Sequence, residues 1–283
     1  MIKFGPSGFC DKFNEKYKHS VQMPLWLEEN GLDAYEYAFN KGVRITDEKA
    51  IEIGNAFKNK NIQLSVHGPY YINLANPDDM MAEKSKMYII ESLQKMRLMG
   101  AKYLVYHPGC LTKNTREKAF ELVMQRTKEL VSLLDEYGFD DIYICPETMG
   151  KHGQIGTVEE VAKMCAIDRR IIPTLDFGHI NAYGLGCLKT KQDFENVFKT
   201  LEKYMGERYK KVHIHFSKIE YGPKGEIKHL TFDSDDKFGP DFKLLEEVLK
   251  ELDIDATVIC ESRGTQTQDA VTMKNMYFDD DNL

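Results

Sequence analysis

Six short apolar stretches of this chain end in side chains of the kind that bind metal ions in proteins. The residues at these ends are His67, His107, Glu147, Asp176 with His179 three positions later, the pair His213 and His215, and Glu261. Imidazole nitrogens and carboxylate oxygens are the usual ligands of zinc and also serve manganese. Charged groups crowded together without a cation would repel one another and lose hydration. Because a single tetrahedral zinc takes about four ligands, this larger set predicts two or three ions.

Individual members of this set have expected roles and alternatives. Glu147 is the carboxylate that we expect to bridge two ions. In the segment KVHIHFSK, alternate residues of an extended strand face the same side, so both histidines could reach the site, and we predict His213 as a ligand and His215 as a supporting residue. Two ions sharing a carboxylate would lower the pKa of a water towards about 7 and so activate it at neutral pH. Alternatively, a buried histidine can be a satisfied core residue, and a carboxylate can pair with a nearby lysine.

The apolar stretches alternate with longer amphipathic segments. The eight stretches are Ile2–Gly5, Ala34–Ala38, Ile62–His67, Tyr103–His107, Asp141–Pro146, Ile171–Leu175, Lys211–Phe216 and Thr257–Cys260. Such alternation favours parallel strands joined by right-handed crossovers, and 283 residues suit a closed (β/α)8 TIM barrel, an α/β fold of about 250 residues. An open doubly wound sheet is the alternative. In a barrel the strand ends meet at one mouth, where the chemistry of such folds gathers.

The segments between the stretches carry the signals of helices. Residues 46–60 open with Thr46 as a cap and space Ile51, Ile53 and Phe57 for an inner face. No linker rich in proline, glycine or serine divides the chain, so we expect a single catalytic domain over residues 1–276 and an acidic tail over residues 277–283. The other expected helices lie within 83–100, 114–138, 157–166, 193–206 and 239–252.

The composition indicates a folded, cytoplasmic protein that we expect to be a monomer. Hydrophobic residues make up 42% and charged residues 29%, as in globular proteins. No apolar stretch approaches the roughly 18 residues that cross a bilayer, and the segment MIKFGPSGFCDKF lacks the apolar core of a signal peptide. The six cysteines form no CxxC pair and are expected to be reduced core residues. The net charge of −7 argues against a broadly basic surface for nucleic acid but allows a local basic groove.

Motifs over roughly residues 60–262 resemble those of the endonuclease IV family of apurinic/apyrimidinic endonucleases. The matching segments are HGPYYINLA from His67, YHPG at His107, PETMGKHGQIG at Glu147, LDFGH at Asp176, HIHFSKIEYG at His213 and CES at Glu261. The resemblance implies a β/α barrel that holds three zinc ions, with manganese as another metal that such donors accept.

The resemblance also implies how the residues divide among the ions. They would be His67, His107 and Glu147 for the first, Glu147, Asp176, His213 and Glu261 for the second, and His179 with His229 and an acid for the third. The family's Asp-Arg-His triplet is replaced by Glu226-Ile-Lys-His229, one residue longer, so His229 is the better candidate ligand and Glu226 the poorer one. The family's Asn-Asp pair is replaced by His215-Phe216.

By this resemblance the protein would cleave double-stranded DNA on the 5′ side of abasic sites, as in base excision repair. Glu147 and Glu261 would be the catalytic carboxylates. Tyr70 and Tyr71 would stack in the gap left by the missing base, and Lys218 would meet a phosphate. An abasic nucleotide is flipped out at little cost, and binding to the phosphates should weaken as salt rises. The two tyrosines could instead pack the barrel rim.

Two other classes of function stay open. A sugar isomerase or epimerase of the same barrel superfamily would use a single divalent metal held by Glu147, Asp176, His213 and Glu261. Such an enzyme does not need His67, His107 or His229. A non-catalytic barrel that binds metal or nucleic acid is the second alternative. The number of ions per chain separates these classes, because three favour the nuclease and one favours the isomerase.

Overall fold

Each apolar stretch of the sequence forms a strand of one ring. The computed structural model of the chain describes residues 2–234 and 237–279. Eight parallel strands of this described part build the ring, and each overlaps a predicted stretch. They are β1 (Lys3–Pro6), β2 (Ala34–Ala38), β3 (Gln63–His67), β4 (Tyr103–Tyr106), β6 (Tyr143–Pro146), β8 (Thr174–Asp176), β9 (Lys211–Phe216) and β12 (Asp255–Cys260).

The ring consists of two four-stranded parallel sheets joined at two seams. Their strand orders are β1-β12-β9-β8 and β2-β3-β4-β6. At one seam Ser7 bridges Glu36 in parallel, just beyond β1 and within β2. At the other, Glu147 bridges Thr174, and the Thr148 N–H donates to the Thr174 carbonyl over 3.0 Å. Because both seams are paired, the barrel is closed, which confirms the predicted TIM barrel and excludes the open sheet.

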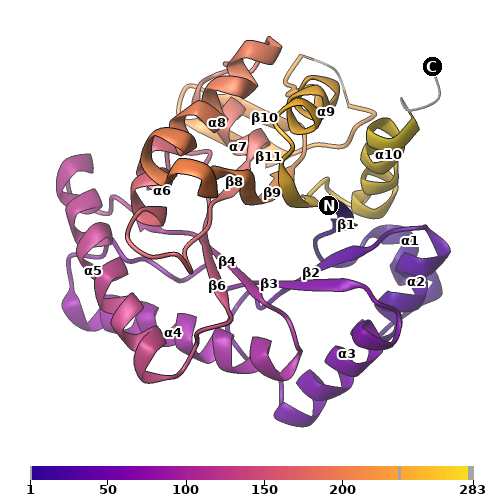
Figure 1. Cartoon of the computed structure of the whole chain (residues 1–283), viewed down its shortest axis with the longest axis horizontal. Helices are drawn as coiled ribbons and strands as arrows, with labels where there is room; N and C mark the ends of the chain where they lie inside the picture. The colour runs from indigo at the N-terminus through magenta and orange to yellow at the C-terminus, as the bar shows by residue number, and fades with distance from the viewer. Residues whose placement is uncertain (1, 235–236, 280–283) are drawn as a thin grey trace.

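Helices form the outer layer around the strands (Figure 1). Those predicted from the sequence are α3 (Asp47–Asn59), α4 (Asp79–Leu98), α5 (Arg116–Glu136), α6 (Val158–Cys165), α8 (Lys191–Met205) and α9 (Phe242–Glu251). The helices not predicted are α1 (Asp11–Lys16), α2 (Met23–Glu29), α7 (Phe177–Tyr183), α10 (Gln266–Asp279) and the 3-10 turns Ser20–Gln22 and Gly206–Lys210. Two short antiparallel pairs lie in the loops that follow the strands: β5 (Gly109–Cys110) with β7 (Gln154–Ile155), and β10 (Ile219–Gly222) with β11 (Gly225–His229).

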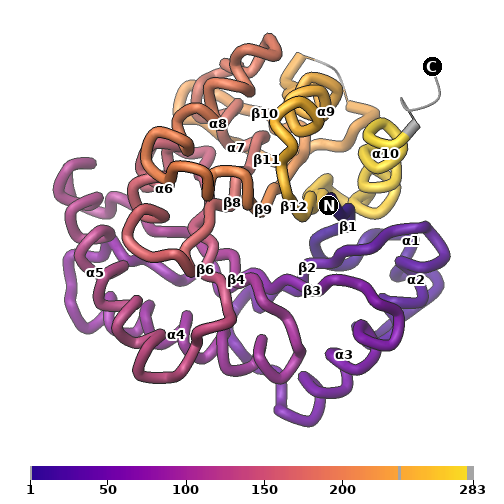
Figure 2. The backbone as a smooth tube through the Cα atoms, viewed as in Figure 1, coloured from indigo at the N-terminus to yellow at the C-terminus, as the bar shows by residue number. Residues whose placement is uncertain are grey.

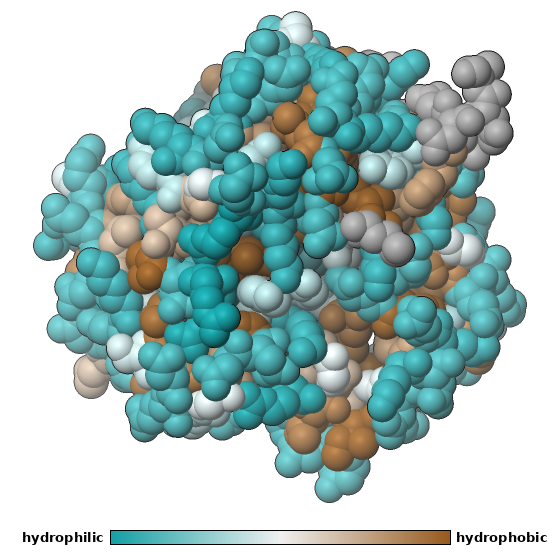
Figure 3. Space-filling view, in the orientation of Figure 1, coloured by the Kyte–Doolittle hydropathy of each residue, from teal (hydrophilic) through white to brown (hydrophobic). Residues whose placement is uncertain are grey.

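Each long helix turns its apolar side toward the barrel. In α3 the Thr46 hydroxyl accepts the Lys49 N–H, as a cap should, and the helix buries Ile53 and Phe57. Ile51, which the sequence placed on the same face, is 44% exposed. It lies two positions from Ile53, and residues two apart in a helix point in different directions. On the face seen in Figure 1, hydrophilic residues predominate and hydrophobic residues form several separate areas (Figure 3).

The two ends of the described chain meet at one side of the barrel (Figure 2). The Tyr277 ring of α10 packs against the Phe4 ring of β1, with centroids 5.7 Å apart. Residues 277–279, which the sequence assigned to an acidic tail, therefore continue a helix, and residues 280–283 lie outside the described residues. In the described part of the chain, no helix is long and apolar enough to cross a membrane.

Replacing Gly5 by alanine should destabilise the barrel. A Cβ at Gly5 would lie 1.7 Å from the Ala34 carbonyl oxygen, which is backbone of the adjacent strand and cannot rotate away. Overpacking of this kind costs about 1–3 kcal/mol or more. The measurement is the urea midpoint of unfolding. The control is Gly153→Ala, where an added Cβ meets nothing within 4 Å; equal midpoints for the two variants would contradict the predicted strand contact.

Candidate metal centre

The predicted donors converge at the mouth formed by the carboxyl ends of the strands. His67 ends β3, Asp176 ends β8, and Glu261 directly follows β12. His107 and Glu147 follow β4 and β6 in the same way. Ligand atoms of the donor residues fall into overlapping groups in which all atoms lie within 4.8 Å of one another. The barrel thus gathers residues that are far apart in the chain at one point.

The first group contains His67, His107 and Glu147. The Nε2 atoms of both histidines face the same oxygen, Glu147 Oε2, at 3.2 and 3.1 Å. His67 Nδ1 lies 2.8 Å from the Gly68 carbonyl oxygen. If Nδ1–H donates to that carbonyl, Nε2 is left as the lone-pair atom that can bind a cation. Glu147 is 1% exposed and His107 26%, so the group is closed below and open toward the mouth.

The second group contains Glu147, Asp176, His215 and Glu261. His215 Nδ1 lies 3.0 Å from Glu147 Oε1 and 3.6 Å from Glu261 Oε2. Asp176 Oδ2 is buried and accepts no hydrogen bond from the described residues. A buried acceptor without a hydrogen bond costs free energy. Asp176 Oδ2 has an ion-pair contact with His179 Nδ1 at 3.3 Å, and a cation among the three carboxylates would satisfy it further. The donor set therefore fits a divalent metal.

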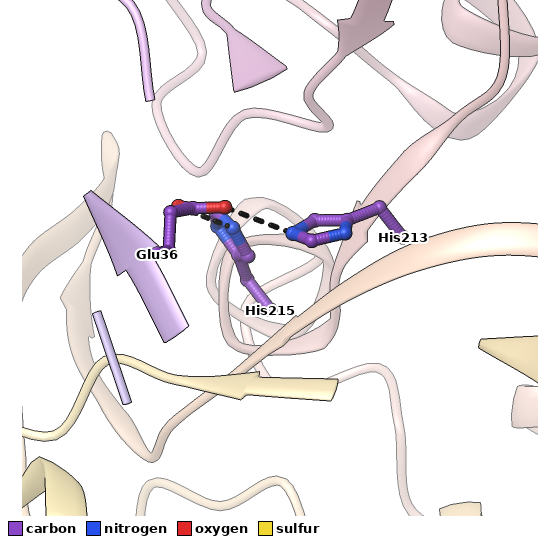
Figure 4. A group of neighbouring side chains, drawn as sticks. All are labelled: Glu36, His213 and His215. Atoms are coloured by element: carbon purple, nitrogen blue, oxygen red, sulfur yellow. Dashed lines mark hydrogen bonds and ion pairs between the residues drawn. The ribbon is translucent and has the colours of Figure 1, made fainter. Parts of the chain in front are cut away.

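His213 is not part of this group, which corrects the sequence-based assignment. Its Nε2 lies 2.9 Å from Glu36 Oε2, and both side chains are buried (Figure 4). The strand register gives the reason, because Asp176 pairs with His215 and Thr174 with His213. His215 is thus level with the strand ends, and His213 lies one layer deeper in the barrel. The structure therefore places His215, and not His213, among the donors of the second group.

The third group contains His179, Glu226 and His229. His179 Nε2 lies 3.4 Å from Glu226 Oε2, and the two imidazole rings are 5.5 Å apart. The sequence rated Glu226 a poor ligand, because the segment from Glu226 to His229 is one residue longer than the family's triplet and carries a different acid. Pairing in the hairpin skips Ile227, since Tyr221 pairs with Glu226 and the next pair joins Glu220 and Lys228. This β-bulge turns Glu226 to the side of His229, so the structure places Glu226 among the donors of the third group.

Backbone contacts hold the hairpin against the mouth. Gly225 has a φ of 93°, a left-handed conformation that glycine adopts without strain. A Cβ there would lie 2.1 Å from the Gly150 carbonyl oxygen, so only glycine allows this approach. The Glu226 N–H donates to the same oxygen over 2.9 Å. The loop after β6 thereby fixes the place of the third group.

Of the predicted substrate-binding residues, the structure places Tyr70 at the mouth and Lys218 elsewhere. Tyr70 is 47% exposed and lines the mouth, a cavity of about 270 Å³ that the three donor groups share. The half-exposed Tyr71 packs its ring 5.0 Å from that of Tyr70. Lys218 lines a different cavity, and its ammonium donates to the Phe232 and Ser234 carbonyls over 2.9 and 3.0 Å. The structure therefore does not bring Lys218 to the metal centre.

Sequence reasoning missed Glu36. Its carboxylate lies in the lumen of the barrel, is fully buried, and contacts both His213 and His215. The available signal was a single acidic residue within the otherwise apolar stretch Ala34–Ala38. A charge in the middle of a buried strand is costly unless it is paired, so this residue marks a polar layer below the mouth.

When no cation is bound, burial and contacts between these groups shift their pKa values. Burial would raise the pKa of Glu147, but nearby imidazoles, chiefly that of His215, outweigh it and hold that pKa well below its usual range. Burial lowers the pKa of His67, yet the Glu147 carboxylate reverses the balance and raises it to about 9. Burial also opposes protonation of His179, and the Asp176 carboxylate leads the groups that raise its pKa to about 10. A binding cation must therefore displace protons.

Comparison of the sequence with known proteins places it among related barrels. Residues 25–277 match the sequence model of a family described as xylose isomerase-like TIM barrel. An uncharacterized protein of Methanocaldococcus jannaschii is 31% identical over 278 residues, which are 98% of this chain and 97% of that protein. A protein of Aquifex aeolicus named "Probable endonuclease 4" is 32% identical over 189 residues, which are 64% of each chain.

Solved structures of two kinds of enzyme share the fold. Endonuclease IV from Thermus thermophilus has a TM-score of 0.66 and 18% identity, over 98% of this chain and 97% of that one. A D-tagatose 3-epimerase-like protein has a TM-score of 0.70 and 20% identity, over 97% of this chain and 95% of that one. At these identities the likeness shows the fold alone.

Zinc affinity should rise with pH up to about 9 to 10. Because the pKa of His67 is raised to about 9 and that of His179 to about 10, both imidazoles hold protons at neutral pH, and zinc must displace them. Each displaced proton strengthens binding up to about tenfold per pH unit below the folded pKa. Chelator-buffered zinc titrations at several pH values measure the affinity, and calorimetry in two buffers counts the protons released. A pH-independent affinity without proton release would contradict the prediction.

Proposed function

Because this chain belongs to the xylose isomerase-like TIM barrel family, we propose that it is a metal-dependent endonuclease that cleaves DNA on the 5′ side of abasic nucleotides. The observation that carries the proposal is the set of three contiguous donor groups at the mouth. The similarity to a relative named "Probable endonuclease 4" supports the same reaction class.

The two outer donor groups distinguish this proposal from a one-metal enzyme. A single ion would need only the central group with Glu147, Asp176, His215 and Glu261. It would leave no role for His67 and His107 on one side or for the His179 group on the other. The outer groups are linked to the central one through shared or touching residues, since His179 Nδ1 lies 3.4 Å from Glu147 Oε1. Such a row of sites suits a phosphodiester, whose several oxygens must be neutralised together.

The residues of the chain would divide the chemistry among them. Divalent ions, zinc or manganese, would supply an activated water and neutralise the phosphate and the leaving oxygen when bound at the three groups. Glu147 would set the spacing of the first two groups, because its Oε2 faces His67 and its Oε1 faces His215. Glu261 is 18% exposed, whereas Asp176 is fully buried. The Glu261 carboxylate is therefore the one that can orient the attacking water and accept a proton from that water.

The rim offers contacts for a nucleotide that lacks its base. Tyr70 and Tyr71 would stack against the neighbouring bases at about 1–3 kcal/mol each. A second cavity of about 280 Å³ adjoins the mouth, since Ala38 lines both, and it is lined by Lys41 and Arg44 among others. These cations would meet backbone phosphates despite the net charge of −7. An abasic nucleotide would enter because it is the easiest to flip out.

The alternative function is that of a sugar isomerase or epimerase. It is favoured by the likeness to the D-tagatose 3-epimerase-like structure and by the acidic net charge. Only the central donor group would then hold a metal. A count of one ion per purified chain, with isomerisation of a ketose in place of DNA incision, would support this alternative.

The purified protein with zinc or manganese should incise a duplex that carries one tetrahydrofuran abasic analogue. Incision should occur on the 5′ side of the analogue and should weaken as salt rises. Denaturing electrophoresis of an end-labelled strand measures it, and the same duplex without the analogue should stay intact. No incision with either metal would refute the proposed function.

Replacing Glu261 by glutamine should lower incision by about 100-fold or more, because the proton acceptor is lost. Binding of the duplex, measured by fluorescence anisotropy, should change little. Glu121→Gln is the matched control, since Glu121 is 68% exposed and pairs only with Lys118 among the contacts described for it. Unchanged incision in the Glu261 variant would mean that this carboxylate has no catalytic role.

Replacing Glu226 by alanine should remove one bound ion. The third group would keep only His179 and His229, and two imidazoles without a carboxylate hold a divalent ion weakly. Plasma mass spectrometry should give three ions per chain for the unchanged protein and two for the variant. Glu220→Ala on the same hairpin is the control, because Glu220 pairs with Lys228. Equal counts for the Glu226 variant and the unchanged protein would exclude Glu226 as a ligand.

A further inference from the structure

A second polar cluster lies directly below the metal centre. Glu36 of β2, with His213 and His215 of β9, brings its donor atoms within 4.8 Å of one another. All three side chains are at most 1% exposed. Figure 4 shows the Glu36 carboxylate facing both imidazole rings. His215 belongs to this cluster and to the central metal group, so it joins the two layers.

Glu36 uses both of its oxygens on these neighbours. Its Oε2 lies 2.9 Å from His213 Nε2 and accepts the Ser65 hydroxyl over 3.0 Å. Its Oε1 lies 3.0 Å from His215 Nε2. This contact is an ion pair, and neither atom makes a hydrogen bond within the described residues.

The chemistry of a carboxylate decides where the ring hydrogens lie. An ionised carboxylate accepts hydrogen bonds and donates none. His213, whose Nδ1 has no partner among the described residues, must therefore carry hydrogen on Nε2 in its neutral form. His215 faces carboxylates with both nitrogens, so it carries hydrogen on both when no cation is bound, and a cation that takes Nδ1 would leave the hydrogen on Nε2. Nδ1, which lies 3.0 Å from Glu147 Oε1 and 3.6 Å from Glu261 Oε2, would then offer its lone pair to that cation.

We propose that Glu36 and His213 are positioning residues that hold His215 as its Nε2–H tautomer, with Nδ1 aimed as a ligand into the central metal group. The inference rests on the metal centre of the proposed function and deepens it. A metal-bound imidazole whose second nitrogen donates to a carboxylate is oriented by that contact and becomes a stronger ligand.

His213 supports Glu36 and does not bind metal itself. A buried carboxylate with a single partner would be poorly compensated, and His213 supplies a second imidazole donor beside the Ser65 hydroxyl. His213 Nδ1 is buried and makes no hydrogen bond to any described residue, so the contact with Glu36 is the polar contact that this side chain makes. The Tyr103 ring stacks against it, with centroids 6.2 Å apart, and fixes its plane.

The same three residues are not a fourth metal site in this proposal. A cation between them would take the place of the hydrogen on His215 Nε2, and the ring would then have to bridge two cations as an anion. The cluster is also closed to solvent. The ion-pair contacts of Glu36 with the two imidazoles compensate its charge without either requirement.

Nitrogen-15 NMR of the histidine rings tests the tautomers in the unchanged protein. In the zinc-loaded protein, His215 should show hydrogen on Nε2 and a zinc-shifted Nδ1, and His213 should show hydrogen on Nε2 with or without zinc. Hydrogen on Nδ1 of His215, or a zinc-induced shift of either His213 nitrogen, would overturn the proposal. This measurement needs no DNA, so a failure of incision does not affect its outcome.

Replacing Glu36 by glutamine should lower the affinity for one zinc ion by about 10- to 100-fold and leave the affinities for the other ions unchanged. Competition with a chromophoric chelator resolves the ions, and circular dichroism checks the fold. Glu246→Gln is the matched control, because Glu246 is also a buried glutamate, 2% exposed, and pairs with Lys250 on α9. Unchanged zinc affinities in the folded Glu36 variant, or a fourth ion in the unchanged protein, would contradict the inference.

Two changes at His213 cover the case in which the Glu36 variant does not fold. His213→Gln keeps an N–H donor for Glu36 and should keep the zinc affinity within about threefold. His213→Phe keeps an aromatic ring but loses the N–H donor. It should lower the affinity for the zinc ion of the central group by about tenfold or more. Equal affinities in these two variants would show that His213 acts only through its volume.

Discussion

The carboxylate of Glu147 is the interaction on which the site depends. Its two oxygens face imidazoles that come from three different strands, His67 and His107 on one side and His215 on the other. The side chain is 1% exposed, so an isolated charge there would be expensive. Protons on the imidazoles compensate it when no cation is present, and cations would do so when bound. The donor groups are therefore one electrostatic unit, and a change at one residue is felt by the others.

Closure of the barrel is what makes this unit possible. The two half-sheets join at Ser7 with Glu36 and at Glu147 with Thr174. The two buried glutamates thus lie at the two seams, where each contacts imidazoles from other strands. Glu147 faces the mouth, and Glu36 lies deeper and faces the lumen of the barrel. Both carboxylates consequently fix side chains across the ring while the backbone beside them closes it.

The sequence was sufficient for the strands, for their common mouth and for most of the donors, because these follow from local patterns and from the geometry of parallel strands. It was insufficient where a side chain's place depends on a distant partner. The place of His215, and not His213, among the donors depends on the register with β8. The inclusion of Glu226 depends on a bulge, and the loss of Lys218 depends on the carbonyls of a loop. None of these partners is visible in the local sequence.

The third donor group differs from the others because two of its residues lie on a hairpin outside the barrel strands. Its acid and one of its histidines are carried by the β10–β11 hairpin, outside the ring of strands, and the hairpin is attached through the contact between Gly225 and Gly150. Insertion or deletion of a single residue in this hairpin would rotate Glu226 away from or toward the mouth, while every barrel strand stayed in place. The number of donor groups in such a barrel can thus diverge between lineages by small changes in one loop, without any cost to the architecture that carries the remaining groups.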